Sequence, residues 1–309
     1  MPINMDEQLN YLIVLLGPTG VGKTDLSIHL SLHFDAPIIS ADSRQFFREM
    51  KIGTAAPSED ILKLTTHYHI GNISITDRYS CGIFETDVLN LLENIYKTKH
   101  SALLVGGSGL YIDAVCKGID DFPAPDPELR NELYEQVKNE GVESIRNQLK
   151  ILDPEYYVQV DLKNTQRLIK AVEVCLQTGR KFSSYHTKSQ KERPFSIIKV
   201  GLSRPREELY DRINKRVDKM ITDGLVDEVN ELYSLKNLNA LNTVGYREIF
   251  DYLDGKHSLE TAIELVKRNS RRYAKRQMTW WARDNTITWF HPDQVDLIVS
   301  FIEQTMNNG

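Results

Sequence analysis

Short apolar runs alternate with amphipathic stretches over the first third of the chain. Apolar runs at 11–16, 36–40 and 101–105 predict strands, and the stretches at 25–34 and 82–98 carry the apolar spacing of helices. Strands that alternate with helices predict a doubly wound parallel sheet. Because ligands of such sheets bind beyond the carboxyl ends of the strands, we expect the residues that follow these three strands to share one edge.

The pattern changes at residues 121–127, where three prolines stand within five positions. Prolines at this density force an extended connection. A helical pattern follows, with Leu168, Ala171, Val172, Cys175 and Leu176 on one apolar face. Asn164 is a suitable N-cap for this helix and Gly179 a suitable stop.

A strand pattern returns at 195–202, helical patterns continue from 204 to 281, and residues 287–290 predict one last short strand. We therefore predict an α/β fold with two domains. The catalytic core comprises residues 1–120 and 194–309, and residues 121–193 form a helical insertion domain.

Composition and charge fit an ordinary globular chain of 309 residues, with 41% hydrophobic residues and a net charge of −5. No apolar stretch reaches the roughly 20 residues of a membrane span, and no signal peptide is visible, so we expect a cytoplasmic protein. Cys81, Cys116 and Cys175 are isolated, which predicts buried thiols and neither a zinc knuckle nor disulfides. The His67-Tyr68-His69 segment offers too few ligands for a metal and is interpreted as structural.

Residues 17–24, here termed the phosphate loop, match the motif G-x-x-x-x-G-K-[ST] in full and lie between a predicted strand and a predicted helix. Backbone N–H groups of such a loop cradle phosphate oxygens, and the helix adds its positive N-terminal end. Lys23 supplies a charge, and the Thr24 hydroxyl can bind Mg²⁺ directly or through water. The loop indicates phosphate rather than ATP, because a diphosphate ester satisfies the same donors. The predicted phosphate-binding residues are Gly17, Pro18, Thr19, Gly20, Val21, Gly22, Lys23 and Thr24.

Asp42 follows the strand at 36–40 and is therefore expected near the phosphate loop, where a carboxylate could accept a proton or hold Mg²⁺ through water. The segment around it also suits a turn or helix cap. The strand at 101–105 ends in glycines rather than in the aspartate that nucleoside triphosphatases often place there. Its absence weakens the interpretation as an ATPase or GTPase.

A stretch from Lys267 to Arg283 carries seven basic residues and no acidic one. Helical spacing places these charges on one continuous face. Tyr273, Trp280 and Trp281 lie within or beside it, and we expect all three in the core. Such a face is typical of binding to a nucleic-acid backbone, although most charge runs are solvated helix surfaces.

These motifs together resemble the tRNA dimethylallyltransferases, the tRNA isopentenyltransferase family of bacterial type without a C-terminal zinc finger. The resemblance covers essentially the whole chain and rests on eight segments in order. They are residues 17–24, 40–45, 52–55, 104–111, 126–130, 166–168, 244–247 and 274–280.

The resemblance implies a P-loop core that transfers a dimethylallyl group from dimethylallyl diphosphate to N6 of adenosine 37 in tRNA, beside the anticodon, with Mg²⁺ as cofactor. It implies Asp42 as the base, with Thr24 and Lys23 on the diphosphate and Arg216 nearby. The target base must leave its stack to reach a strand edge. We expect a monomer.

The resemblance also implies a set of tRNA contacts in the core and the insertion. Asp42, Ser43, Arg44 and Gln45 would line the adenosine pocket. The remaining residues implied to bind tRNA are Ser108, Arg130, Gln166, Arg167, Leu168, Ile169, Lys170, Asn242, Thr243, Val244, Gly245, Tyr246, Arg247, Lys275, Arg276 and Gln277.

Three alternatives remain open from the sequence. An adenylate isopentenyltransferase acting on free AMP or ADP shares the chemistry but needs neither the insertion nor the basic face. A small-molecule kinase would need an arginine-rich lid, for which the insertion is a candidate. An RNA-binding GTP switch would need the guanine-reading motif N-K-x-D, which does not occur in the sequence.

Overall fold

The computed structural model describes residues 9–186 and 190–308, which belong to two compact units. The core unit contains the chain up to Lys117 and from Glu192 onward, and the insertion unit is Gly118–Lys191. Sequence analysis set the insertion at 121–193, close to these limits. Each unit is described by itself below.

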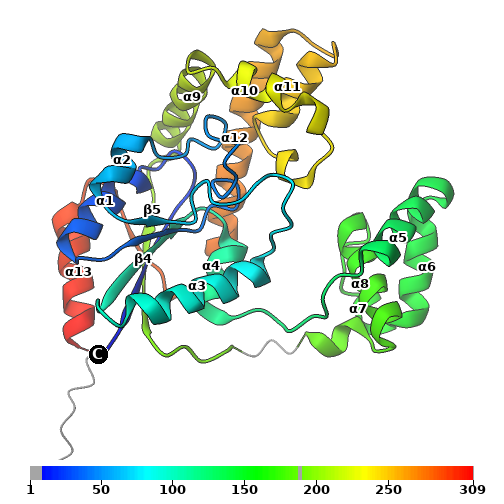
Figure 1. Cartoon of the computed structure of the whole chain (residues 1–309), viewed down its shortest axis with the longest axis horizontal. Coiled ribbons are helices and arrows are strands. Elements are labelled where there is room, and N and C mark those ends of the chain that lie inside the picture. Colours follow the sequence, from blue (N-terminus) through cyan, green and yellow to red (C-terminus); the bar gives the residue numbers. More distant parts are fainter. Residues whose placement is uncertain (1–8, 187–189, 309) are drawn as a thin grey trace, which may run out of the picture. The chain divides into compact units, whose positions relative to one another are not determined.

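The core unit is built on a six-stranded parallel sheet with the order β3-β2-β4-β1-β5-β6. Figure 1 labels β4 and β5 of this sheet. Leu16 at the end of β1 pairs with Gly106 at the end of β4, so the loops that follow them start side by side. The strands are β1 Tyr11–Leu16, β2 Ile38–Ser40, β3 His67–Tyr68, β4 Ser101–Gly106, β5 Ser196–Leu202 and β6 Thr288–Phe290.

Helices cover both faces of this sheet. The helices of the core unit are α1 Lys23–His33, α2 Glu59–Leu64, α3 Cys81–Ile95, α4 Gly109–Lys117, α9 Arg206–Thr222, α10 Leu225–Glu231, α11 Tyr246–Leu253, α12 Leu259–Trp281 and α13 Val295–Asn307, with short 3₁₀ helices η2 Tyr233–Leu235 and η3 Asn239–Leu241.

Alternate residues of the central strand β1 enter two different hydrophobic cores. Leu12, Val14 and Leu16 pack with residues of α3 and α4, whereas Ile13 and Leu15 pack with residues of α1, α9 and α13. A strand buried on both faces reads as a continuous apolar run, which is why the sequence of β1 shows no alternation. The predicted doubly wound α/β class is confirmed.

Four elements of the core unit were not predicted from the sequence, namely α2, β3, α4 and α13. β3 is only two residues long, and both of its side chains are half-buried, so it leaves no readable pattern. The final helix α13 was not predicted, although it buries Ile298 and Ile302 against β1 and β5. The predicted strands at 36–40, 195–202 and 287–290 begin one or two residues before β2, β5 and β6.

The insertion unit consists of helices around its own hydrophobic core. They are α5 Pro127–Glu140, α6 Val142–Leu152, α7 Pro154–Tyr157, α8 Thr165–Thr178 and the 3₁₀ helix η1 Phe182–Tyr185. The cap and stop predicted for α8 are confirmed: the Asn164 side chain accepts from the Arg167 N–H, and Gly179 adopts a left-handed conformation with φ of 66°. Leu176, predicted on the apolar face, is instead exposed.

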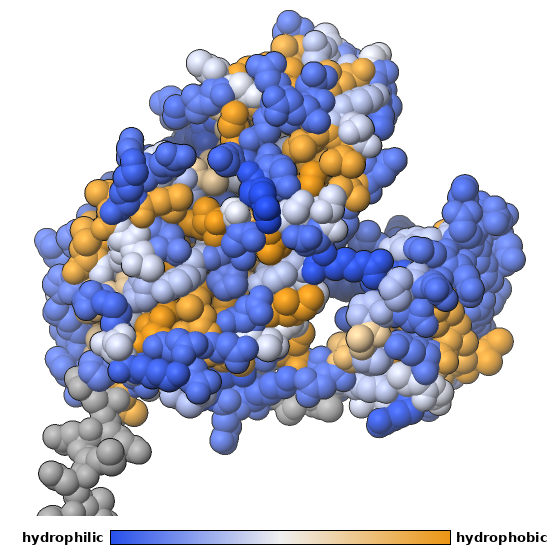
Figure 2. Space-filling view, in the orientation of Figure 1, coloured by the Kyte–Doolittle hydropathy of each residue, from blue (hydrophilic) through white to orange (hydrophobic). Residues whose placement is uncertain are grey.

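The surface is mainly hydrophilic, and two of the three thiols are buried as predicted. Figure 2 shows hydrophilic residues over most of the face that it draws, with apolar areas between them. Cys116 and Cys175 are buried free thiols, whereas Cys81 is only half-buried, so its predicted burial is wrong. Among the described residues, no helix is long and apolar enough to cross a membrane.

Candidate phosphate and tRNA site

The phosphate loop follows β1 and runs directly into α1, as its motif requires. Gly20 and Gly22 adopt positive φ values of 80° and 111°, a conformation that favours glycine. The Lys23 ammonium donates to the carbonyl oxygens of Gly17 at 2.8 Å and Pro18 at 3.0 Å. The lysine is thus folded back over its own loop. Thr24, the next residue of α1, is exposed.

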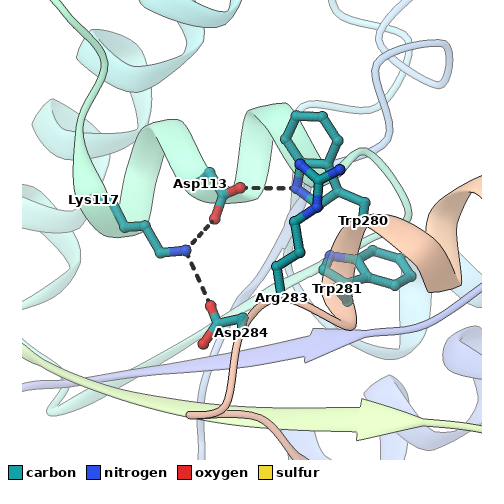
Figure 3. A pocket seen from close by; sticks show the side chains of 6 residues that line it. All are labelled: Asp113, Lys117, Trp280, Trp281, Arg283 and Asp284. Atoms are coloured by element: carbon teal, nitrogen blue, oxygen red, sulfur yellow. Dashed lines mark hydrogen bonds and ion pairs between the residues drawn. The ribbon is translucent and has the colours of Figure 1, made fainter. Parts of the chain in front are cut away.

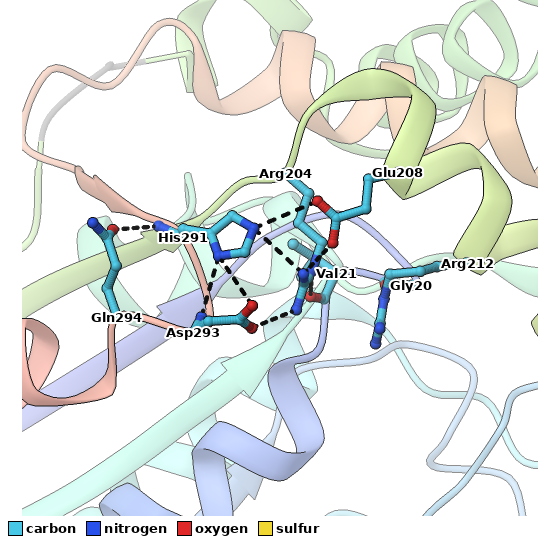
Figure 4. A network of polar contacts seen from close by, with 8 residues as sticks. All are labelled: Gly20, Val21, Arg204, Glu208, Arg212, His291, Asp293 and Gln294. Atoms are coloured by element: carbon cyan, nitrogen blue, oxygen red, sulfur yellow. Dashed lines mark hydrogen bonds and ion pairs between the residues drawn. The ribbon is translucent and has the colours of Figure 1, made fainter.

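Three arginines from the segment leading into α9 and from α9 itself hold consecutive residues of this loop. Arg216 Nη1 donates to the Thr19 hydroxyl at 3.1 Å. Arg212 Nε donates to the Gly20 carbonyl at 2.9 Å, and Arg204 Nε to the Val21 carbonyl at 2.9 Å (Figure 4). Bonds to the carbonyls fix the loop without using the N–H groups that phosphate would need.

Arg204 is itself buried in a polar network (Figure 4). Its guanidinium forms ion pairs with Glu208 and, at 3.0 Å, with Asp293, and His291 lies between these two carboxylates. The Arg204 guanidinium, together with His291, lowers the pKa of Glu208 despite some desolvation. Sequence analysis named Arg216 but missed Arg204 and Arg212, because nothing in their local sequence marks them.

Asp42 lies just beyond β2, in a half-buried segment fixed by the end of β4. The Ala41 N–H donates to the Val105 carbonyl at 2.7 Å, and the Ser43 N–H donates to the Ser108 hydroxyl at 3.0 Å. The Asp42 carboxylate accepts the Arg44 N–H at 3.0 Å. The predicted meeting of these strand ends at one edge is therefore observed.

Asp42, Lys23 and Arg216 interact electrostatically. Burial lowers the pKa of Lys23 to about 8, an effect that the Asp42 carboxylate opposes and the Arg216 cation increases. Burial also lowers the pKa of Arg216, again opposed by Asp42. A carboxylate and two desolvated cations thus lie within electrostatic reach of one another beside the phosphate loop.

The residues expected to line the adenosine pocket, Asp42 to Gln45, are half-buried. Gln45 Nε2 donates to the carbonyls of Thr54 and Ala55, each at 3.3 Å, and Arg44 donates to the Asn239 carbonyl at 3.2 Å. The Thr54 carbonyl also accepts from Arg216 at 3.2 Å. The segment after Met50 therefore links the predicted adenosine side to the diphosphate side.

Glu228 of α10, which the sequence analysis missed, fastens that segment. Its carboxylate accepts the N–H groups of Ile52 at 2.7 Å and Gly53 at 2.9 Å, and the Tyr246 hydroxyl at 2.6 Å. A side chain at Gly53 would collide with the Tyr246 ring at 2.5 Å. Tyr246 is fully buried, so its side chain offers no surface to tRNA, whereas Asn242 and Arg247 are exposed and Thr243 and Val244 half-buried.

Residues 106–109, here termed the second glycine loop, lie beside the phosphate loop. A side chain at Gly106 would meet the Ala41 carbonyl at 2.3 Å, and one at Gly107 would meet Gln277 at the same distance. Gln277 is buried and hydrogen-bonded to both loops. It therefore does not lie on the tRNA-facing surface that the sequence predicted for it.

The basic residues on the face of α12 differ in their exposure and in their partners. Lys267 pairs with Asp218 at 2.8 Å and with Glu264 at 3.1 Å, and Arg271 donates to Asn214 at 2.6 Å. The exposed basic residues of the face are Arg268, Arg272, Lys275, Arg276 and Arg283. Carboxylates of α9 and of α12 itself thus pair with Lys267 at the start of the face, whereas the partner of Arg271 is a neutral amide.

Trp280 does not belong to the core, contrary to expectation. It is 39% exposed and donates its indole N–H to Asp113 at 2.8 Å, whereas Trp281 is buried (Figure 3). The two indoles line a cavity of about 180 Å³ together with Lys117 and Arg283. Lys117 pairs there with Asp113 and Asp284.

In the insertion unit, the predicted tRNA contacts divide by burial. Leu168 and Ile169 are buried in its core, whereas Gln166, Arg167 and Lys170 of the same helix are exposed. Any side-chain contact from this segment must therefore come from the three polar residues. Lys170 lies over the Phe122 ring at 4.1 Å.

Arg130 of the insertion unit, a further predicted tRNA contact, already has a carboxylate partner. It forms an ion pair with the buried Glu173 at 2.6 Å. A second Glu173 oxygen accepts the Asp126 N–H at 3.0 Å. The pair ties the start of α5 to α8.

The fold and the loop define a P-loop α/β protein with a helical insertion, in which the Asp42 carboxylate interacts electrostatically with Lys23 and Arg216. The family model described as IPP transferase matches residues 45–284. The chain belongs to this family, as the sequence resemblance indicated.

Named relatives and solved structures agree with this assignment. A tRNA dimethylallyltransferase 1 from Bacteroides fragilis is 52% identical and covers 96% of this chain and 98% of its own. A tRNA dimethylallyltransferase 1 from Phocaeicola vulgatus is 53% identical, and the match covers 94% of this chain and 97% of the relative.

Among solved structures, the full-length tRNA isopentenylpyrophosphate transferase of Bacillus halodurans is 34% identical, with a TM-score of 0.71 and 97% of each chain covered. A eukaryotic dimethylallyltransferase acting on tRNA has a TM-score of 0.79 at 25% identity, covering 92% of this chain and 74% of its own.

Proposed function

We propose that this protein transfers the dimethylallyl group of dimethylallyl diphosphate to N6 of adenosine 37 in tRNA, yielding N6-(dimethylallyl)adenosine and diphosphate. The observation that carries the proposal is the carboxylate of Asp42 within the electrostatic reach of Lys23 and Arg216 at the phosphate loop. β4 ends in glycine rather than aspartate, which disfavours triphosphate hydrolysis. The names of its relatives point the same way.

In the proposed reaction, the adenosine N6 attacks C1 of the prenyl group, and the bond from C1 to the diphosphate oxygen breaks. Asp42 accepts the proton that N6 releases. Lys23, Arg216 and the N-terminal end of α1 stabilise the negative charge that develops on the leaving diphosphate. Lys23 and Asp42 follow strands β1 and β2 of the sheet, and Arg216 comes from α9.

Magnesium fits this site through the substrate rather than through a protein cage. The described residues contain no cluster of three His, Cys, Asp or Glu side chains that could hold a metal. Mg²⁺ typically takes few protein ligands and binds substrate phosphates and water. Thr24, exposed in the first turn of α1, would supply the protein ligand. The ion, when bound, would share the charge of the diphosphate.

For tRNA we propose contacts from the exposed basic residues of α12, from Gln166, Arg167 and Lys170, and from Asn242 and Arg247. Asp42 to Gln45 would surround the flipped adenosine, with Ser108 holding Ser43 in place. A single chain carries all of these groups, which supports action as a monomer, in the cytoplasm where tRNA is used.

The test is a reaction of the protein with unmodified anticodon stem-loop RNA, dimethylallyl diphosphate and Mg²⁺, followed by mass analysis of the nucleosides. Parallel reactions contain free AMP or ADP, or RNA with guanosine at position 37. We expect the prenylated adenosine only from the unaltered RNA. Product from free AMP at a comparable rate would favour the adenylate isopentenyltransferase, and a requirement for ATP would refute prenyl transfer.

A further inference from the structure

Gln277 lies between the two loops of the site although its neighbours along α12 face solvent. Its side-chain oxygen accepts the Thr19 N–H at 2.9 Å, and its side-chain nitrogen donates to the Gly107 carbonyl at 2.8 Å. Gln277 is only 6% exposed, whereas Lys275 and Arg276 are exposed. The same helix therefore presents cations outward and one carboxamide inward.

We propose that Gln277 is a positioning residue of the phosphate loop and not a tRNA contact. Thr19 is held twice, at its N–H by Gln277 and at its hydroxyl by Arg216. Holding Thr19 from both sides fixes the start of the loop, so that the following N–H groups keep their direction toward the diphosphate. The inference rests on the proposed function only for the identity of that diphosphate.

The chemistry of the contact restricts the residue that can make it. Thr19 offers a donor and Gly107 an acceptor, so the bridging group must accept on one side and donate on the other. A carboxamide does both, a carboxylate only accepts, and a thioether does neither effectively. Asn is one methylene shorter and would not span the same distance.

Two substitutions of Gln277 separate these requirements. Gln277→Met keeps the size and removes both bonds, so that the half-buried Thr19 N–H and the buried Gly107 carbonyl lose this partner. At about 1–3 kcal/mol for such groups, the affinity for dimethylallyl diphosphate should fall by about tenfold to a hundredfold. Affinity for tRNA should stay within about twofold, since Gln277 is outside the exposed face. Both affinities are measured directly, without turnover.

Gln277→Glu adds a pH readout that general damage to the fold would not give. The ionised carboxylate accepts from Thr19 but repels the Gly107 carbonyl and the diphosphate. The protonated form restores the donor. Diphosphate affinity of Gln277→Glu relative to the wild type should therefore rise as pH falls through the pKa of that carboxyl group, whereas the ratio for Gln277→Met should stay flat.

A third variant reaches the same contact from the opposite side. A methyl group at Gly107 would lie 2.3 Å from Gln277 Nε2, and the next nearest atoms outside Gln277 are at 3.8 Å. Gly107→Ala should therefore weaken diphosphate binding in the wild-type background and add little to Gln277→Ala, which leaves room for it. Such non-additivity is the mark of two residues acting through one contact.

The outcomes distinguish this inference from the proposed function. Weaker tRNA binding with unchanged diphosphate binding in Gln277→Met would make Gln277 a tRNA contact and overturn the proposal. Additive effects of Gly107→Ala and Gln277→Ala would also overturn it, as would wild-type diphosphate affinity in Gln277→Met. Failure of the wild type to prenylate RNA would sink the proposed function, while the binding comparisons would still test Gln277. If Gln277→Met does not fold, the Gly107→Ala pair and the pH ratio decide.

Discussion

The phosphate loop and the second glycine loop follow neighbouring strands, but their glycines serve different purposes. In the phosphate loop, Gly20 and Gly22 adopt positive φ values, a conformation that favours glycine. In the second loop, Gly106 and Gly107 let protein groups approach, namely the Ala41 carbonyl and the Gln277 side chain. We propose that the first loop holds an anion, whereas the second loop holds neighbouring segments of the protein.

In the proposed mechanism, the two loops therefore have different roles. Lys23 acts from the phosphate loop itself, whereas the second glycine loop acts through the segment it supports. The Ser108 N–H donates to the Ala41 carbonyl at 3.2 Å, and Asp42 is the next residue along the chain. Substitutions in the two loops should therefore affect different steps.

The largest effect is expected at Asp42, the residue supported by the second glycine loop. Asp42→Asn removes the base and should lower kcat by about 10²–10⁴. The affinities for tRNA and dimethylallyl diphosphate should stay within a few fold, because the backbone bonds of the segment remain. Single-turnover kinetics and separate binding titrations measure both. Turnover within threefold of wild type would remove Asp42 from the mechanism.

The next largest effect is expected at Lys23 of the phosphate loop. Lys23→Met should lower kcat/KM for dimethylallyl diphosphate by about 10²–10³, the typical effect of losing one charge-stabilising group. Affinity for tRNA should be unchanged. Loss of tRNA binding with intact use of the diphosphate would reverse the assignment of the two loops.

The pKa of Lys23 adds a pH dependence. In the free protein this pKa is lowered to about 8, and a bound diphosphate favours the protonated form. Affinity should therefore be greatest below pH 8 and fall as pH rises above it, by up to about tenfold per unit. Lys23→Arg stays charged and should flatten the curve between pH 7 and 10. A wild-type curve as flat as that of Lys23→Arg would contradict the lowered pKa.

A third substitution, Gly106→Ala, tests the structural role of the second glycine loop. Gly106→Ala would place a methyl group 2.3 Å from the Ala41 carbonyl, a backbone group that cannot rotate away. Overpacking of this kind costs about 1–3 kcal/mol of unfolding free energy, and kcat should fall because Asp42 is displaced. Denaturant titration and turnover measure both.

Gly141→Ala, in the insertion unit, is the matched control for Gly106→Ala. Its φ of 84° makes it strained, but nothing lies within 4 Å of the added methyl group. It should lose some stability and keep its kcat. If Gly106→Ala behaves like this control, the second loop does not position Asp42.

The two loops also show where sequence reasoning succeeds and where it stops. The motif of the phosphate loop spans eight consecutive residues. The apolar run before it and the helical pattern after it are local as well, so the loop, its strand and its helix were predictable. The residues that hold the rest of the site are distant: Gln277 is 170 residues from Gly107, and Glu228 is 176 residues from Ile52. No local pattern marks such residues. The exposure of Trp280 was not predicted for the same reason: Asp113, which accepts its indole N–H, lies on another helix.

The smallest effect on chemistry is expected from residues that touch neither loop, the exposed cations of α12. If Lys275 and Arg276 neutralise tRNA phosphates, replacing both by alanine should weaken tRNA binding. It should also flatten the dependence of log K on log salt by about 0.7–0.9 for each phosphate that is no longer neutralised. Binding of dimethylallyl diphosphate should not change.

The matched control is Lys215→Ala with Lys219→Ala, which removes two exposed charges of α9 that pair with Asp211 and Asp223. This control alters the net charge equally, so an equal loss of slope in both double variants would mean that only the overall field matters. A loss confined to the α12 variant would make this face the one that contacts the tRNA backbone.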